Sequence, residues 1–395
     1  MMTEITTVFD ADNHYYEPMD AFTRYIEPEF KRRCMMWAEV NGRQMLLVGG
    51  KINRFIPNPT FDMLSAPGSL EQYFRGRNPK GDSVKDLFGE LLPCDPAYRD
   101  REIRLKTMDS LNVDGALFFP TLAVGMEQAL GDDLPAAQAA FRAFNRWLEE
   151  DWGFAYENRI FSTPYIVLSD VDNAVAELEW ALDRDARVVL VGTGPVRTDE
   201  GLKSPGDPRF DPFWARVQES GVTIVYHGGA NAYYDLITMW GEKSEMEAHK
   251  FEPLRQALSH DAVADTFAAL ILHGVMDRFP NIRFATVETG ANWVRPLLKR
   301  FGKIYGQTPS MFTNNPVEQF KKNVWVSPFY EDDLDLLRDT LGADRLMLGS
   351  DWPHTEGMAD PFTFITDLTE AGFSPDEQQL IMYDNCKSLT VRRPA

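Results

Sequence analysis

The sequence is poor in cysteine and in positive charge, and it has no long apolar run. Its three cysteines, Cys34, Cys94 and Cys386, are an odd number without C-x-x-C spacing, which fits a reducing compartment and offers no zinc-finger or disulfide pattern. With 40 Lys and Arg against 60 Asp and Glu, the formal charge of -20 argues against nucleic acid or an anionic membrane as a partner. No segment approaches the roughly 18 apolar residues of a membrane span, and the first residues do not resemble a secretory signal. We therefore expect a cytoplasmic protein.

Motifs for two common enzyme chemistries are also missing. No G-x-S-x-G elbow follows a predicted strand, and neither a G-x-G-x-x-G fingerprint nor a phosphate loop opens a helix. Serine hydrolysis and nucleotide binding therefore lack support.

What the sequence does contain is an alternation of short apolar runs with amphipathic segments, over 395 residues that are 44% apolar. This alternation is typical of a parallel sheet covered by helices, and eight such runs predict an α/β fold, a (β/α)8 TIM barrel formed by a single domain over residues 1–395. The eight predicted strands are Thr6–Phe9, Val113–Phe119, Ile160–Leu168, Arg187–Val191, Val222–Tyr226, Ile282–Val287, Asn323–Val326 and Arg345–Leu348.

Helical periodicity marks several of the intervening segments. The clearest are Asp170–Leu182, Ala262–Arg278, Glu331–Leu341 and Asp376–Leu389. Ser374-Pro375-Asp376-Glu377 predicts a capping box with proline in the first turn of the last helix.

Residues 15–112 are too many for a simple connection between the first two strands, so we expect an inserted element that roofs the site. Within it, Asn41-Gly42 is flanked by alternating residues and predicts a β-hairpin.

Side chains that bind metals follow several of the predicted strands, and in a barrel the reactive residues project from these C-terminal ends. They are Asp10, Asp12, His14 and Glu17 after the first strand, His227 after the fifth, Glu288 after the sixth, and Asp351 with His354 after the eighth. Residues two apart on a strand face the same side, so Asp12 and His14 are predicted to bind one ion together with His227 and Asp351.

The chain resembles the "amidohydrolase 2" branch of the amidohydrolase superfamily, nearly from end to end. The resemblance is carried by Asp10-x-Asp12-x-His14-x-x-Glu17-Pro18, Arg104 with Met108-Asp109, Val113-Asp114-Gly115, Asn145-Arg146-Trp147, Arg278-Phe279-Pro280, Glu288-x-Gly290-x-x-Trp293 and Gly349-Ser350-Asp351-x-Pro353-His354-x-Glu356-Gly357. That branch includes aminocarboxymuconate semialdehyde decarboxylase and hydrolases of ring-cleavage products. The resemblance implies a divalent metal held by the first strand, the fifth-strand His and the eighth-strand Asp.

Departures from the family pattern bear on the reaction. The usual His-x-His of the first strand is Asp12-x-His14 here, the catalytic His expected after the sixth strand is replaced by Glu288-Thr-Gly, and Val191-Gly-Thr-Gly has no lysine that could form a carbamylated bridge. These differences weaken both decarboxylation and conventional dinuclear zinc hydrolysis.

The remaining ligand candidates are two imidazoles and four carboxylates: Asp12, His14, Glu17, His227, Glu288 and Asp351. A carboxylate-rich set without thiolates favours iron or manganese over zinc and has room for two ions. It resembles the sites of the few non-haem di-iron monooxygenases with this fold, and O2-dependent hydroxylation by two iron ions, with an electron donor as partner, is the leading hypothesis. The alternative is a hydrolase or non-oxidative decarboxylase with one Mn or Zn ion, in which Asp351 is the base and His354 polarises the substrate. Glu288 is a further candidate catalytic residue.

Aromatic side chains are frequent in the segments expected over the barrel mouth. Tyr15, Tyr16, Trp293, Phe329, Tyr330 and Trp352 are the predicted substrate contacts, and they favour a bulky apolar carboxylic acid or its thioester. By analogy with other barrels we expect a homodimer. His273 is expected to pack in the core, and His249 and His260 to lie on the surface.

Overall fold

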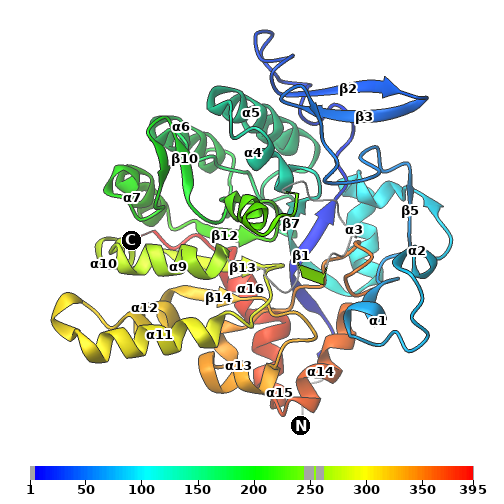
Figure 1. Cartoon of the computed structure of the whole chain (residues 1–395). Coiled ribbons are helices and arrows are strands. Elements are labelled where there is room, and N and C mark those ends of the chain that lie inside the picture. The colour runs from blue at the N-terminus through cyan, green and yellow to red at the C-terminus, as the bar shows by residue number, and fades with distance from the viewer. Residues whose placement is uncertain (1–4, 244–252, 255–261, 395) are drawn as a thin grey trace.

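The computed structural model describes residues 5–243, 253–254 and 262–394. Its centre is a set of parallel strands in two ladders, one ordered β1-β7-β8 and the other β14-β13-β12-β9 (Figure 1). These strands are β1 (Val8–Tyr15), β7 (Val113–Pro120), β8 (Ile160–Ser162), β9 (Val188–Leu190), β12 (Thr223–His227), β13 (Arg283–Val287) and β14 (Val324–Val326).

Isolated bridges join the two ladders into a ring. Tyr165 pairs with Leu190 between β8 and β9, and Val326 of β14 pairs with Leu346. The ring closes on β1, where Ala11 N donates to Leu348 O at 2.8 Å. The predicted (β/α)8 barrel is therefore confirmed, with its eighth position filled by an extended segment rather than by a regular strand.

The eighth segment is irregular for a local reason. Ala343–Arg345 forms a short 3-10 turn, so only the residues after it are extended, and Asn13 pairs with Trp352 beyond the end of the ladder. The predicted strand Arg345–Leu348 is wrong in its first residue. This irregular segment carries Asp351 and His354 at the barrel mouth.

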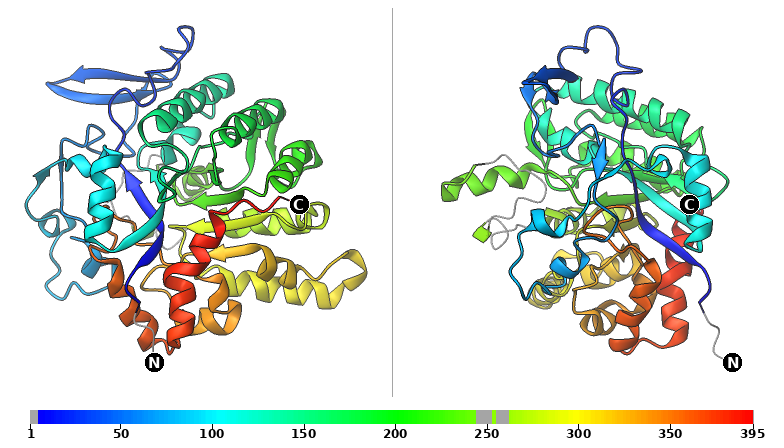
Figure 2. Two further views of the ribbon diagram at one scale, coloured as in Figure 1. Left: turned by 180° about the vertical axis from the view of Figure 1, so that it is seen from behind. Right: turned by 90° about the vertical axis from the view of Figure 1, so that its right-hand side faces the viewer.

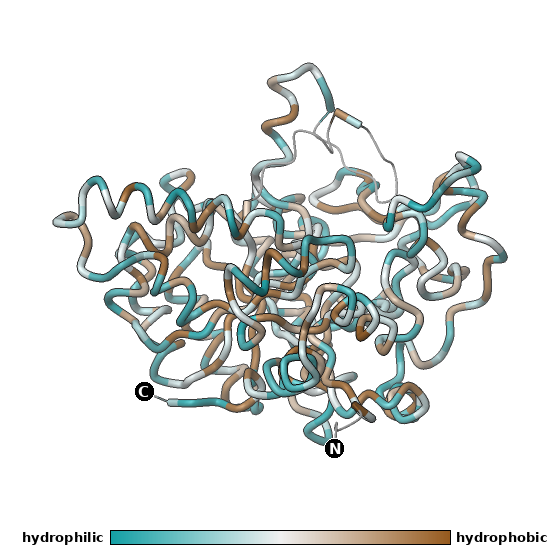
Figure 3. Tube along the Cα trace, turned by 90° about the horizontal axis from the view of Figure 1, so that it is seen from below, coloured by the Kyte–Doolittle hydropathy of each residue, from teal (hydrophilic) through white to brown (hydrophobic). Residues whose placement is uncertain are grey.

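Helices cover the outside of the ring. The longer ones are α3 (Arg101–Ser110), α5 (Leu134–Asp151), α6 (Val171–Leu182), α7 (Asp211–Ser220), α9 (Ala262–Leu272), α11 (Val294–Gln307), α12 (Pro316–Asn323), α13 (Leu334–Leu341) and α14 (Phe364–Glu370). The shorter ones are α4 (Met126–Ala129), α10 (Val275–Arg278), α15 (Pro375–Gln379) and α16 (Asn385–Leu389). Hydrophilic and hydrophobic stretches alternate along the outer helices (Figure 3), as expected when one face of each helix is buried.

Local signals place the helix boundaries. The predicted capping box is present, with the side chains and backbones of Ser374 and Glu377 bonded reciprocally. The predicted helix Ala262–Arg278 is interrupted at Gly274, whose φ of 76° is left-handed and separates α9 from α10. The predicted helix Asp376–Leu389 is also divided, because a π-helical turn at Leu380–Asp384 lies between α15 and α16.

The segment between β1 and β7 forms a separate layer at the mouth. It contains the antiparallel β2 (Met35–Val40), β3 (Arg43–Val48) and β4 (Lys51–Ile52), a second pair β5 (Met63–Leu64) and β6 (Leu92–Pro93), and the short helices α1 (Glu71–Phe74) and α2 (Val84–Leu87). Val40 pairs with Arg43 across Asn41-Gly42, which confirms the predicted hairpin. β2 and β3 project from the end of the molecule opposite α13, α14 and α15 (Figures 1 and 2).

Two backbone hydrogen bonds fasten this inserted layer to the eighth segment. Gly68 N donates to His354 O at 3.0 Å, and Leu70 N donates to Thr355 O at 2.7 Å. Among the described residues, no helix has the length and apolar character needed to cross a membrane.

Candidate metal centre and active site

The C-terminal half of strand β1 carries the first two side chains of the site. Asp12 and His14 are both almost fully buried and stand two residues apart, where strand alternation turns both side chains to the same face. Asp12 Oδ1 lies 3.2 Å from His14 Nε2. A register irregularity of β1 against β7 lies between Asp10 and Asn13 and so includes Asp12.

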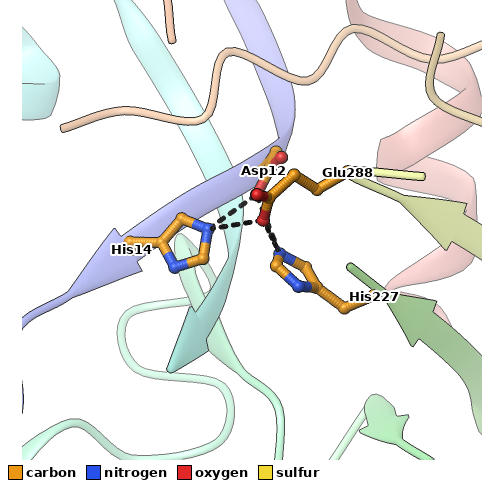
Figure 4. A group of neighbouring side chains, drawn as sticks. All are labelled: Asp12, His14, His227 and Glu288. Carbon is orange, nitrogen blue, oxygen red and sulfur yellow. Dashed lines mark ion pairs between the residues drawn. The ribbon is translucent and has the colours of Figure 1, made fainter. Parts of the chain in front are cut away.

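Neighbouring strands supply the second half. His227 is the last residue of β12 and pairs with Val287 of β13, so Glu288 follows directly beside it. His227 Nε2 lies 3.1 Å from Glu288 Oε2 and 3.5 Å from Asp12 Oδ1. Figure 4 shows the four side chains converging from three strand ends.

Local backbone features orient His227 and Glu288. Glu288 has a φ of 51°, which turns its side chain out of the normal strand alternation. His227 Nδ1 lies 2.7 Å from the carbonyl of Gly228; because a carbonyl only accepts, Nδ1 carries a proton and leaves Nε2 free.

The donor atoms are suited to a cation. One ligand atom from each of Asp12, His14, His227 and Glu288 lies within 4.8 Å of the others. Asp12 Oδ1, His14 Nε2 and His227 Nε2 are buried, yet none makes a hydrogen bond. Buried polar atoms without partners are costly, and a shared divalent ion would satisfy all three at once.

Electrostatics in the absence of an ion support this assignment. Burial tends to raise the pKa of Asp12, but His14 and His227 outweigh it and bring that pKa below its ordinary value. Burial, with the nearby His354, lowers the pKa of His14 to about 3. Burial, together with Asp351, raises the pKa of Glu288 to about 8. His14 is therefore neutral at physiological pH, as a metal ligand must be.

Asp351 and His354 form a second group of side chains beside the four candidate ligands. Asp351 Oδ1 is 3.3 Å from His14 Nε2 and 2.6 Å from His354 Nδ1, and the rings of His14 and His354 stack at 3.9 Å. Burial, followed by the charge of Asp12, raises the pKa of Asp351 well above its ordinary value.

Proton positions at His354 follow from its partners. Thr121 Oγ1 donates to the carbonyl of Tyr15 at 2.9 Å, so it accepts from His354 Nε2 at 3.0 Å. Nε2 is then protonated, and Nδ1 lies 2.6 Å from Asp351 Oδ1. The sequence predicts that His354 polarises the substrate; in the structure its two ring nitrogens lie beside Asp351 and Thr121.

Sequence reasoning missed Thr121 and Glu356. A carboxylate oxygen of Glu356 lies within 4.8 Å of oxygens from Glu288 and Asp351, and these three form a further acidic group. The available signal was position, because Glu356 stands two residues beyond His354 and Thr121 directly follows β7.

The predicted ligand Glu17 does not join the site. Its buried carboxylate accepts hydrogen bonds from the backbone nitrogens of Thr121, Leu122 and Ala123 at 2.9 to 3.3 Å. Its oxygens are therefore used to hold the loop after β7, and the prediction of Glu17 as a metal ligand is corrected to this structural role.

The site opens into a hollow of about 430 Å³ lined by Asp12, Glu288, Asp351, Glu356, Phe329 and Tyr330. Phe329 and Tyr330 thus lie where substrate contacts were predicted. Arg75 of the inserted layer stacks on the Tyr330 ring at 4.2 Å, and Tyr330 donates to Glu356 O at 2.7 Å.

The other predicted substrate contacts lie elsewhere. Tyr15 packs between Trp147 and Trp152 in the core, and Trp293 packs against Phe267 and Phe320, so neither residue lines this hollow. Trp352 is buried against Tyr98 and the guanidinium of Arg104, outside the lining of this hollow. Tyr16 lies closest to the site, with its ring 5.7 Å from that of His354.

His273 is the one further histidine among the described residues, and it is not one of the candidate metal ligands. His273 is exposed and its Nδ1 lies 2.7 Å from Ser204 Oγ, so the prediction that it packs in the core is wrong. His249 and His260 lie outside the described residues.

Comparison with known proteins identifies the family. The model of the amidohydrolase family matches residues 45–389. The chain belongs to this family. A solved amidohydrolase from Mycobacterium avium subsp. paratuberculosis K-10 is 39% identical, with 98% of this chain and 100% of that chain covered at a TM-score of 0.92. The family membership makes this barrel an enzyme of the amidohydrolase superfamily.

More distant members share the fold. A 2,6-dihydroxybenzoate decarboxylase from Rhizobium is 20% identical, with 81% of this chain and 94% of that chain covered at a TM-score of 0.57. A dihydroxybenzoic acid decarboxylase from Polaromonas sp. JS666, solved with manganese and 2-nitroresorcinol, is 18% identical, with 82% and 94% covered and the same TM-score. No curated protein matches the chain.

Proposed function

We propose that this protein is a metal-dependent hydrolase that binds one divalent cation through Asp12, His14, His227 and Glu288. The observation that carries the proposal is the convergence of these four side chains, three of which present buried donor atoms without hydrogen bonds. When bound, such a cation polarises a carbonyl oxygen and lowers the pKa of water.

The protein's own residues supply the proton transfers. Asp351 lies beside His14 at the rim of the hollow, where its carboxylate is placed to take the proton of the attacking water. His354 contacts Asp351 and positions it, and Thr121 holds His354 through Nε2. The proton then passes from Asp351 to the leaving group.

The donor set selects among cations. Two imidazoles and two carboxylates without thiolate suit manganese, iron or zinc, and the oxygen-rich surroundings favour manganese or iron. The manganese in the Polaromonas sp. JS666 decarboxylase supports manganese as the first ion to test.

Titration of chelator-treated protein with Mn²⁺ tests the proposal. We expect one ion per chain in the wild type, loss of binding in His14→Ala and His227→Ala, and unchanged binding in His273→Ala, the matched exposed histidine. Mn²⁺-loaded protein should hydrolyse members of an ester, lactone and amide panel equally well with and without oxygen, and Asp351→Asn should abolish this turnover. Binding that survives both alanine substitutions, or turnover that requires oxygen, would overturn the proposal.

A second candidate is O2-dependent hydroxylation with two iron ions and an electron donor. The observation in its favour is the acidic group Glu288, Asp351 and Glu356, which shares Glu288 with the first site and lies within ligand distance of it. Two irons per chain with substrate-dependent O2 uptake would support this candidate. One ion per chain with oxygen-independent turnover would exclude it.

A further inference from the structure

A second hollow opens at the same end of the barrel. Its walls are largely apolar, including Leu134, Val167 and Val191. Its polar side chains include Glu127 and Arg197, and Arg197 is the only cationic residue among the described residues that line it.

The hollow adjoins the proposed metal site. Leu190 of β9 pairs with Val225 of β12, and Val191 N still donates to Val225 O at 3.1 Å. Continued by two residues, that register would set Gly192, which lines the hollow, beside His227. Ala230 and Asn231, which follow His227 by three and four residues, also line the hollow, so the two sites share one loop.

Two glycines make room for the polar groups of this hollow. A Cβ atom at Gly192 would lie 2.6 Å from Glu127 Oε2, and a Cβ at Gly131 would lie 2.8 Å from both Cδ and Nε of Arg197. Neither glycine has a positive φ, so close approach of these side chains is what requires them. The positions of Glu127 and Arg197 are thus built into the backbone.

Arg197 keeps one donor without a partner. Its Nε is buried without a hydrogen bond, while its Nη2 forms an ion pair at 3.3 Å with Asp235, whose side chain is 55% exposed. Glu127 accepts a hydrogen bond from the Tyr165 hydroxyl at 2.5 Å, and burial raises its pKa, which favours its neutral form. A guanidinium held this way in an apolar hollow is suited to a carboxylate.

We propose that this hollow binds a carboxylate of the substrate, with Arg197 as its partner and the apolar walls around the adjoining hydrocarbon. The substrate is then an apolar molecule that carries a carboxylate separate from the group that reacts at Asp12 and His227. The claim that the bound carboxylate belongs to the substrate rests on the proposed function. The claim that the hollow binds a carboxylate does not.

Three fragments of similar shape and different charge test the ligand class. Benzoate, phenol and benzylamine are titrated by calorimetry into Mn²⁺-loaded protein and into chelator-treated protein. We expect benzoate to bind most tightly in both, because the hollow contains none of the four proposed metal ligands. Phenol or benzylamine binding as tightly as benzoate would overturn the proposal.

Variants locate the binding. Arg197→Gln is expected to weaken benzoate binding about tenfold, which is the effect of losing one charge-assisted hydrogen bond. Gly131→Ala should weaken it as well, because the added methyl group displaces Arg197. Arg142→Gln is the matched control, since Arg142 is 32% exposed against 33% for Arg197 and also pairs with one carboxylate. Equal affinity in wild type and Arg197→Gln would disprove the assignment.

The outcomes separate the two proposals. Arg197-dependent benzoate binding in a protein that takes up no Mn²⁺ would keep this inference and remove the proposed function. Stoichiometric Mn²⁺ binding with benzoate affinity independent of Arg197 would do the reverse.

Discussion

Ser350 donates two hydrogen bonds to Asp10, from its backbone nitrogen to Oδ1 at 2.9 Å and from its hydroxyl to Oδ2 at 2.5 Å. Asp10 also accepts from Asp12 N at 3.1 Å and from Asn13 Nδ2 at 2.7 Å. This buried carboxylate therefore joins the strand that carries Asp12 to the turn that carries Asp351.

Asp10→Asn should weaken both the fold and the cation site. Four donors face the carboxylate, and an amide would turn its own N–H groups toward some of them. We expect the free energy of unfolding to fall by about 2 kcal/mol and cation affinity to fall about 10- to 100-fold, measured by denaturant unfolding and chelator competition. Asp20→Asn, at an exposed aspartate paired with Arg24, is the control. Unaltered cation affinity in Asp10→Asn would show that Asp10 does not position the ligands.

Glu17→Gln and Glu288→Gln form a matched pair of carboxylate substitutions. Glu17 is bonded to backbone nitrogens, so its variant should unfold at a lower temperature while binding the same number of ions with similar affinity. Glu288 faces His227, so its variant should lose cation affinity. Metal analysis after dialysis and thermal unfolding distinguish the two. The reverse pattern would return Glu17 to the ligand set.

Thr121→Val should slow turnover without removing the cation. The valine keeps the shape of threonine but loses the acceptor for His354 Nε2, so the ring is free to rotate away from Asp351. We expect kcat to fall about tenfold, with KM little changed, and Thr121→Ser to recover most of the activity. Steady-state kinetics on the hydrolysed panel members provide the measurement. A valine variant with normal kcat would contradict the role given to Thr121.

Stability of the cation-free protein should depend on pH through Glu288. Burial and Asp351 raise its pKa from the ordinary 4.5 to about 8, so the folded chain retains a proton that the unfolded chain releases. Stability contributed by this proton is complete below about pH 4.5 and is lost as the pH rises through 8. Urea unfolding of the wild type minus that of Glu288→Gln isolates the effect. A difference that stays constant from pH 5 to 9 would rule it out.

The positions of the strand ends could be predicted from the sequence, because a buried parallel strand requires a continuous apolar run. Apolar runs mark buried parallel strands, all of which open at one end of a barrel, so His227 and Glu288 were placed correctly without knowledge of their distance. The Asn41-Gly42 hairpin likewise follows from local turn chemistry.

Long-range partners could not be found in the same way. Nothing in the sequence around Glu17 reveals that three backbone nitrogens near residue 122 converge on it. Tyr15 was assigned to the pocket by its aromatic character, although alternation next to the inward-facing His14 turns it toward the opposite face and Trp147. The number of cations depends on side-chain distances between separate strands, which spacing along the chain does not encode.

The hydrogen bonds from Gly68 and Leu70 to the backbone at His354 and Thr355 make the inserted layer and the eighth segment one mechanical unit. A displacement of that stretch of the inserted layer would pull on the carbonyl of His354 and so on its contact with Asp351. A deletion in the inserted layer would then disturb Asp351 without touching a candidate ligand.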